Sequence, residues 1–158
     1  MASYKTVQEQ TTISDAISSG YSILQSLRDE VQEIVDNASD GLRETQRIQT
    51  FDETANTLGN FCDDEPDVPD NLSAHAVTAY LQQHVSKRRS PSRAVQCQNA
   101  VGYLRAAADG VQEFIDTFDG EDRSETEQAE VDDAQELLDI LEESISEAEC
   151  CEFPGMYG

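Results

Sequence analysis

Apolar residues recur at alternating intervals of three and four along two stretches of the chain, residues 90–118 and 124–149. This spacing places them on one face of an α-helix, and that face must pack against another element. The stripes consist of Ala94, Cys97, Val101, Leu104, Ala108, Val111, Ile115 and Phe118, and of Val131, Ala134, Leu138, Leu141, Ile145 and Ala148. A short polar connection favours antiparallel packing. We therefore predict a helical hairpin over residues 91–149, with Ser90 as its cap and Pro91 at its first position.

The same rhythm predicts a long helical segment over residues 14–60, capped by Thr12 or Ser14. Asp40 and Gly41 weaken the helix near its middle, so that either one helix bends there or two helices meet. The apolar positions before and after this interruption are Ile17, Leu24, Leu27, Val31, Ile34 and Ala38, and then Leu42, Ile48, Phe51, Ala55 and Leu58. The first group is expected to pack on the hairpin as a third wall.

Pro66 and Pro69 predict a loop over residues 61–71, because the residue before a proline avoids helical dihedral angles. Residues 72–88 are predicted to form a short amphipathic helix, and a strand over "AVTAYL" is the alternative. The apolar positions behind this helix prediction are Val77, Tyr80, Leu81 and Val85.

Residues 150–158 form a tail with three large apolar side chains. These side chains, Phe153, Met156 and Tyr157, predict that the tail either folds back on the helices or docks on a neighbouring subunit as an assembly contact.

These segments together predict an all-α fold. A chain of 158 residues fits one domain. We expect residues 1–158 to form a single elongated antiparallel bundle of three to four helices, with coiled-coil-like seams.

The net charge of the chain limits the kinds of partner that it is expected to bind. The chain has 33 acidic and 10 basic residues and a net charge of −23, which disfavours direct nucleic-acid binding, because that binding uses surplus lysine and arginine. No run approaches the roughly 20 apolar residues of a membrane helix. The first ten residues lack the apolar core of a signal peptide. A cytoplasmic protein with basic protein partners and no membrane contact is therefore expected.

Five acids step by four and three along residues 132–147 and form an acid stripe on one helix face. The acid stripe consists of Asp132, Glu136, Asp139, Glu143 and Glu147. Three interpretations are open. The stripe is a solvated face, an imitation of the phosphate backbone that enters a basic groove, or a surface for docking on another basic protein or for self-assembly.

Signatures of catalysis and of metal binding are absent. The chain has no phosphate-cradling glycine loop, nucleophile elbow or HExxH motif. It lacks the Glu-x-x-His pairs of bundle metal centres, and its cysteines form no CxxC pair. We predict no catalytic residue, no bound metal and no cofactor. The basic cluster "SKRRSPSR" would either hold an anion or offset the acidic surface.

Residues 11–42, "TTISDAISSGYSILQSLRDEVQEIVDNASDGL", and residues 152–158, "EFPGMYG", carry a family resemblance. They resemble small acidic helical proteins encoded by tailed bacteriophages. The resemblance transfers no functional residue, but it implies a product that acts in an infected bacterium or in the virion. Some acidic phage proteins inhibit nucleases and defence proteins by imitating DNA.

The functional hypothesis is a non-enzymatic acidic interaction protein, a DNA mimic that inhibits a host nuclease or other nucleic-acid-binding or defence protein. The alternative is a structural or virion-associated helical homo-oligomer or assembly factor.

Overall fold

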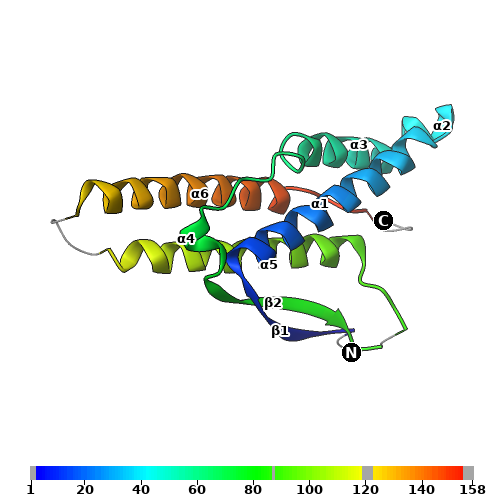
Figure 1. Cartoon of the computed structure of the whole chain (residues 1–158). Helices are drawn as coiled ribbons and strands as arrows, with labels where there is room; N and C mark the ends of the chain where they lie inside the picture. Colours follow the sequence, from blue (N-terminus) through cyan, green and yellow to red (C-terminus); the bar gives the residue numbers. More distant parts are fainter. Residues whose placement is uncertain (1–2, 87, 119–122, 155–158) are drawn as a thin grey trace.

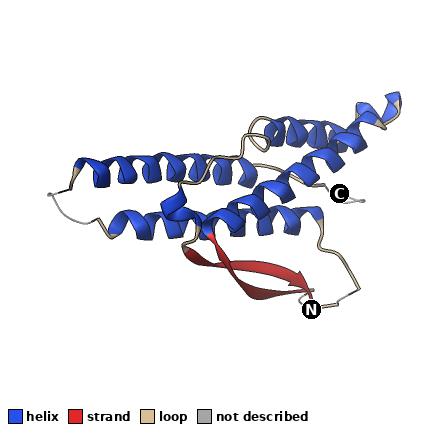
Figure 2. Cartoon of the chain, in the orientation of Figure 1, coloured by secondary structure: helices blue, strands red, loops and turns tan. Residues whose placement is uncertain are grey.

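The computed structural model describes residues 3–86, 88–118 and 123–154 (Figure 1). The described elements are β1 (Tyr4–Thr12), α1 (Ile13–Asp36), α2 (Asp40–Arg43), α3 (Gln46–Gly59), α4 (Asp70–Ser73), β2 (Ala76–His84), α5 (Arg93–Asp116) and α6 (Glu125–Glu149). The predicted all-α fold is wrong, because β1 and β2 pair as an antiparallel sheet against the helices (Figure 2).

The sheet joins two segments that lie far apart in the sequence. Tyr4 pairs with His84 at one end of the register and Thr12 pairs with Ala76 at the other. In β2 buried side chains alternate with more exposed ones, since Val77 and Ala79 are buried and Tyr80 is 60% exposed. The helix predicted over residues 72–88 is therefore wrong, and the strand alternative is correct for this segment. The strand β1 pairs with β2 through main-chain hydrogen bonds, and the pattern of apolar residues does not predict such bonds.

Helix α5 is the central element, and it packs against α6, α1 and β2 (Figure 1). The thiol of Cys97, near its start, donates a hydrogen bond to the carbonyl of Ala148, near the end of α6. The predicted antiparallel hairpin is thus confirmed. Leu104 lies against Gly20 of α1, where a Cβ atom would be 2.8 Å from its Cδ2 atom. The apolar stripe of α5 is therefore shared between α6 and α1.

A second side of α5 lies directly on β2. A Cβ atom at Gly102 would be 2.7 Å from the carbonyl oxygen of Tyr80. The side chain of Asn99 accepts a hydrogen bond from the amide of Gln82 at 2.7 Å and donates one to its carbonyl at 3.0 Å. Asn99 thus takes the place of a neighbouring strand along the edge of β2 that faces away from β1.

The N-terminal helical segment divides into separate helices, so the second of the two alternatives is correct. α1 ends at Asp36, and α3 packs back against it. Val31 of α1 forms a small core with three residues of α3, Ile48, Phe51 and Ala55. Because the chain reverses direction between α1 and α3, the apolar positions after residue 41 belong to a second helix and do not extend the apolar face of α1.

Both predicted caps can be compared with the structure. The hydroxyl of Thr12 accepts a hydrogen bond from the amide of Asp15, as expected for the start of α1. The predicted cap of the hairpin at Ser90 is wrong, because Ser92 accepts the hydrogen bond of the Val95 amide. Pro91 therefore precedes the helix, which begins at Arg93. The sequence "SPS" offers two serines two residues apart, and local spacing does not distinguish them.

The described part of the tail folds back on the helices. The hydroxyl of Thr54, which is 3% exposed, donates a hydrogen bond to the carbonyl of Glu152 at 2.8 Å. Phe153 packs against both apolar cores. The predicted assembly contacts Met156 and Tyr157 lie outside the described residues.

Within the described ranges, none of the helices combines the length and apolar composition that crossing a bilayer requires.

Candidate interaction surface

Helix α6 forms an outer layer of the molecule, with one face against α5. Its first turn is capped by Ser124, whose hydroxyl accepts a hydrogen bond from the amide of Glu127. The buried side chains of α6 are Val131, Ala134, Leu137, Leu138, Leu141, Ser144, Ile145 and Ala148. Because these residues occupy the inner face, the acids between them are directed to solvent.

All five residues of the acid stripe are exposed. Two of their carboxylates accept hydrogen bonds from glutamine amides one helical turn earlier. Gln128 donates to Asp132 at 2.8 Å, and Gln135 donates to Asp139 at 3.0 Å. These neutral donors position the carboxylates and leave their charge in place. Among the described residues, none of the five takes part in an ion pair.

The charge density of the whole helix is high. α6 contains eleven acidic residues and no basic one in its 25 residues. A helix of this length extends about 37 Å at about 1.5 Å per residue. It therefore carries about one carboxylate per 3.4 Å of axis, which equals the axial charge spacing of about 3.4 Å along one strand of DNA.

The loop after α3 adds further acids beside the end of the stripe. A surface hollow of about 350 Å³ is lined by Glu143 and Glu147 of the stripe and by Asp64 of this loop. From the sequence alone, the loop acids belong only to the predicted loop over residues 61–71. Their run of three acids, residues 63–65, was the available signal, but only the fold places them beside α6.

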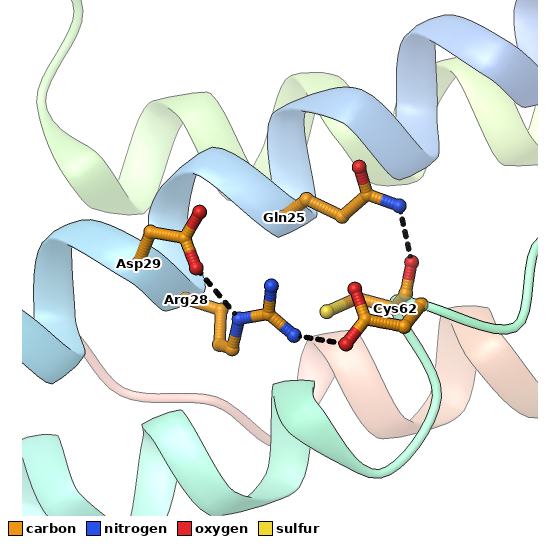
Figure 3. Close-up of polar contacts among 5 residues, drawn as sticks. Gln25, Arg28, Asp29 and Cys62 are labelled. Carbon is orange, nitrogen blue, oxygen red and sulfur yellow. Dashed lines mark hydrogen bonds and ion pairs between the residues drawn. The ribbon is translucent and has the colours of Figure 1, made fainter.

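Polar contacts to α1 fix this acidic loop in position (Figure 3). Gln25 donates a hydrogen bond to the carbonyl of Cys62 at 2.7 Å, and Arg28 forms ion pairs with Asp29 and Asp63. Because the loop is anchored at residues 62 and 63, the acids that follow are presented at a defined place.

A buried hydrogen bond ties α1 to the inner face of α6 beneath the same loop. The hydroxyls of Tyr21 and Ser144 are 2.7 Å apart. Burial raises the pKa of Tyr21, the bond to Ser144 lowers it, and the nearby charges of Glu65 and Asp64 raise it. The acidic surface is thus built over a neutral and well-packed support.

Two further arginines, Arg93 and Arg105, form ion pairs with acids that do not belong to the stripe. Arg93 of the predicted basic cluster pairs with Glu30 of α1 at 2.8 Å, and its guanidinium lies 5.9 Å from the ring centre of Phe51. Arg105 pairs with Glu149 at the end of α6. Lys87 of the cluster lies outside the described residues. The described pairings of Arg93 favour the charge-offset interpretation over an anion site.

Two cysteines near the tail, Cys97 and Cys151, have little nucleophilic character. Burial is the main cause that raises the pKa of Cys97 to about 11 and that of Cys151 to about 12. A thiol reacts as its thiolate, so these groups are weak nucleophiles at neutral pH. Within the described ranges, no group of three or more histidine, cysteine or acidic side chains is arranged to hold a metal ion.

Comparison of the chain with models of protein families, with curated proteins and with solved structures found no match.

Proposed function

We propose that this protein acts by binding, and that the acidic face of α6 occupies the nucleic-acid groove of a basic host protein, such as a nuclease. The observation that supports the proposal is the axial charge density of α6, which matches that of one DNA strand. The phage resemblance leads us to place this interaction in the cytoplasm of an infected bacterium.

The arrangement suits such a partner for two physical reasons. Exposed carboxylates of one sign accelerate encounter with a basic groove through long-range attraction. The helix that bears them is held by its buried face against α5, so little conformational entropy is lost when the charges meet their partners. Occupation of the groove would then exclude DNA by direct competition.

The first prediction compares two variants of equal charge. One neutralises the acid stripe with D132N, E136Q, D139N, E143Q and E147Q. The matched control neutralises five exposed acids between the end of α1 and α3, through E33Q, D40N, E44Q, D52N and E53Q. Purified bacterial nucleases and DNA-binding proteins provide the targets. The measurement is displacement of a fluorescent DNA duplex from each target by the parent and by each variant.

The parent should displace the duplex from at least one target, and the stripe variant should do so about fivefold or more weakly. Exposed ion pairs contribute about 0.2–1 kcal/mol each, so the loss of five amounts to at least about 1 kcal/mol. The control should retain most of the parent's affinity. Equal losses in both variants would show that only net charge matters and would contradict a site on α6.

A further inference from the structure

Strand β1 has a free edge that faces solvent. It lies on the far side of β2 from α5 (Figure 1). The other edge of β2 is covered by α5, where Asn99 bonds the main chain of Gln82. Thus β1 is the one strand of the described sheet whose second edge has no neighbouring element.

Main-chain groups alternate along an antiparallel strand between the two edges, and the observed hydrogen bonds identify which amides and carbonyls of β1 lie on the free edge. Val85 donates to the carbonyl of Ser3 at 2.8 Å, so odd-numbered residues bond each other between the strands. Gln82, whose amide and carbonyl face Asn99, pairs with Thr6. Even-numbered residues of β1 therefore direct their amides and carbonyls away from β2. Among the described residues, no hydrogen bond reaches these main-chain groups at Tyr4, Thr6, Gln8 and Gln10.

The free edge lacks two common protections against pairing, which are a short strand and an interrupting proline. β1 is nine residues long and contains no proline, whereas exposed edge strands are commonly short or interrupted by proline or a bulge. The sheet also carries almost no net charge. Lys5 and Glu9 are the two charged residues in the two strands. Two copies of this chain would meet here with less repulsion than on α6.

We propose that β1 pairs with β1 of a second copy, antiparallel about a two-fold axis at Val7, to form a four-stranded sheet. In this register Thr6 and Gln8 of opposite copies exchange main-chain hydrogen bonds. Lys5 of each copy lies directly opposite Glu9 of the other, and these are non-hydrogen-bonded pairs, whose side chains approach most closely.

Charge complementarity selects this register. An axis at Gln8 also satisfies the hydrogen-bond phase, but it would place Lys5 opposite Thr11 and Glu9 opposite Val7. An axis at Thr6 would place Lys5 opposite Val7. The axis at Val7 therefore gives two ion pairs between opposite charges, and the other two registers give none.

The test uses sedimentation velocity of the full chain over a wide range of concentrations. The parent should pass from monomer to dimer as its concentration rises. Gln8→Pro removes an amide on the free edge and leaves the bonds between β1 and β2 intact, so this variant should remain monomeric. A parent that stays monomeric at every concentration would overturn the proposal, as would a Gln8→Pro variant that dimerises like the parent.

A charge exchange tests the register and does not depend on the fold of the proline variant. Lys5→Glu alone places two acids opposite each other in both pairs, and it should raise the dissociation constant of the dimer roughly tenfold. Adding Glu9→Lys to that variant restores both opposite-charge pairs. It also removes the hydrogen bond between Glu9 and Tyr103 within each copy, so the dissociation constant should return to within a few-fold of the parent's. Failure of the double exchange to recover dimerisation would overturn the register. The stripe variant of α6 should dimerise at least as well as the parent, so the two proposals fail separately.

Discussion

At the scale of single residues, glycine determines how closely α5 approaches the sheet. A Cβ atom at Gly102 would meet the Tyr80 carbonyl oxygen at 2.7 Å, and a main-chain atom in a paired strand cannot move aside alone. Gly102→Ala should therefore lower the free energy of unfolding by about 1–3 kcal/mol, even though alanine favours helix formation over glycine. Chemical denaturation measures this change.

Gly41 provides the control for this prediction. It also lies in a helix, α2, but a Cβ atom there would have no neighbour within 4 Å. Gly41→Ala should leave the free energy of unfolding unchanged or raise it slightly. Equal effects of the two substitutions would mean that helix propensity, and not contact with β2, determines the result.

The sequence contained a signal for this contact that apolar periodicity does not detect. Gly102, Ala106 and Gly110 recur every four residues and form a row of small side chains on α5. A Cβ atom at Gly110 would be 2.5 Å from Cγ1 of Val77. Small residues at this spacing indicate a closely packed neighbour, but they do not say whether it is a helix or a strand. Nor do they indicate that Asn99 bonds the main chain of Gln82.

At the scale of elements, the long helices were predictable because each carries one wide apolar stripe. Leu104 and Leu141 lie in the centres of the α5 and α6 stripes, and both are fully buried. Replacing either leucine with alanine should lower the free energy of unfolding by about 2–5 kcal/mol, through lost burial and the cavity that remains. Urea denaturation followed by circular dichroism tests this prediction.

Leu42→Ala is the matched control, because Leu42 is 54% exposed in α2. Its effect should stay within about 0.5 kcal/mol. If Leu104→Ala or Leu141→Ala were as mild as this control, the assignment of the stripes to the core would be incorrect.

The strands were less predictable than the helices, because the apolar spacing of β2 fits both a helix and a strand. Val77, Tyr80, Leu81 and Val85 fit a helical face, yet Tyr80 and Val85 are exposed and Ala79 is fully buried. When the apolar residues of a short segment fit both a helix and a strand, the element that packs against the segment determines which structure forms. That partner, β1, has Tyr4 and Val7 as its large apolar residues. It is also distant in the chain, since Thr12 pairs with Ala76, which lies 64 residues later.

At the scale of the whole molecule, charge is distributed unevenly over the layers. The eleven acids of α6 lie on one side of α5, and the nearly uncharged sheet lies on the other (Figure 1). The sequence identified the acid stripe and its exposure, since both follow from the helical spacing. The contribution of the loop acids and the free edge of β1 depends on the fold, because each brings together segments that are distant in the chain.

This distribution predicts opposite effects of salt on folding and on binding. With a net charge of −23, like charges repel one another in the compact state, and the repulsion is screened as the Debye length falls from about 30 Å at 0.01 M salt to about 3 Å at 1 M. The midpoint of thermal unfolding should therefore rise with sodium chloride concentration. The stripe variant, which has five fewer negative charges, should show a smaller rise.

Displacement of DNA from the basic target should weaken over the same range, because screening also removes the attraction between α6 and the groove. Thermal scans and displacement assays on the same samples separate the two effects. A midpoint that falls with salt would mean that specific ion pairs, such as Arg93 with Glu30, outweigh the repulsion among the acids.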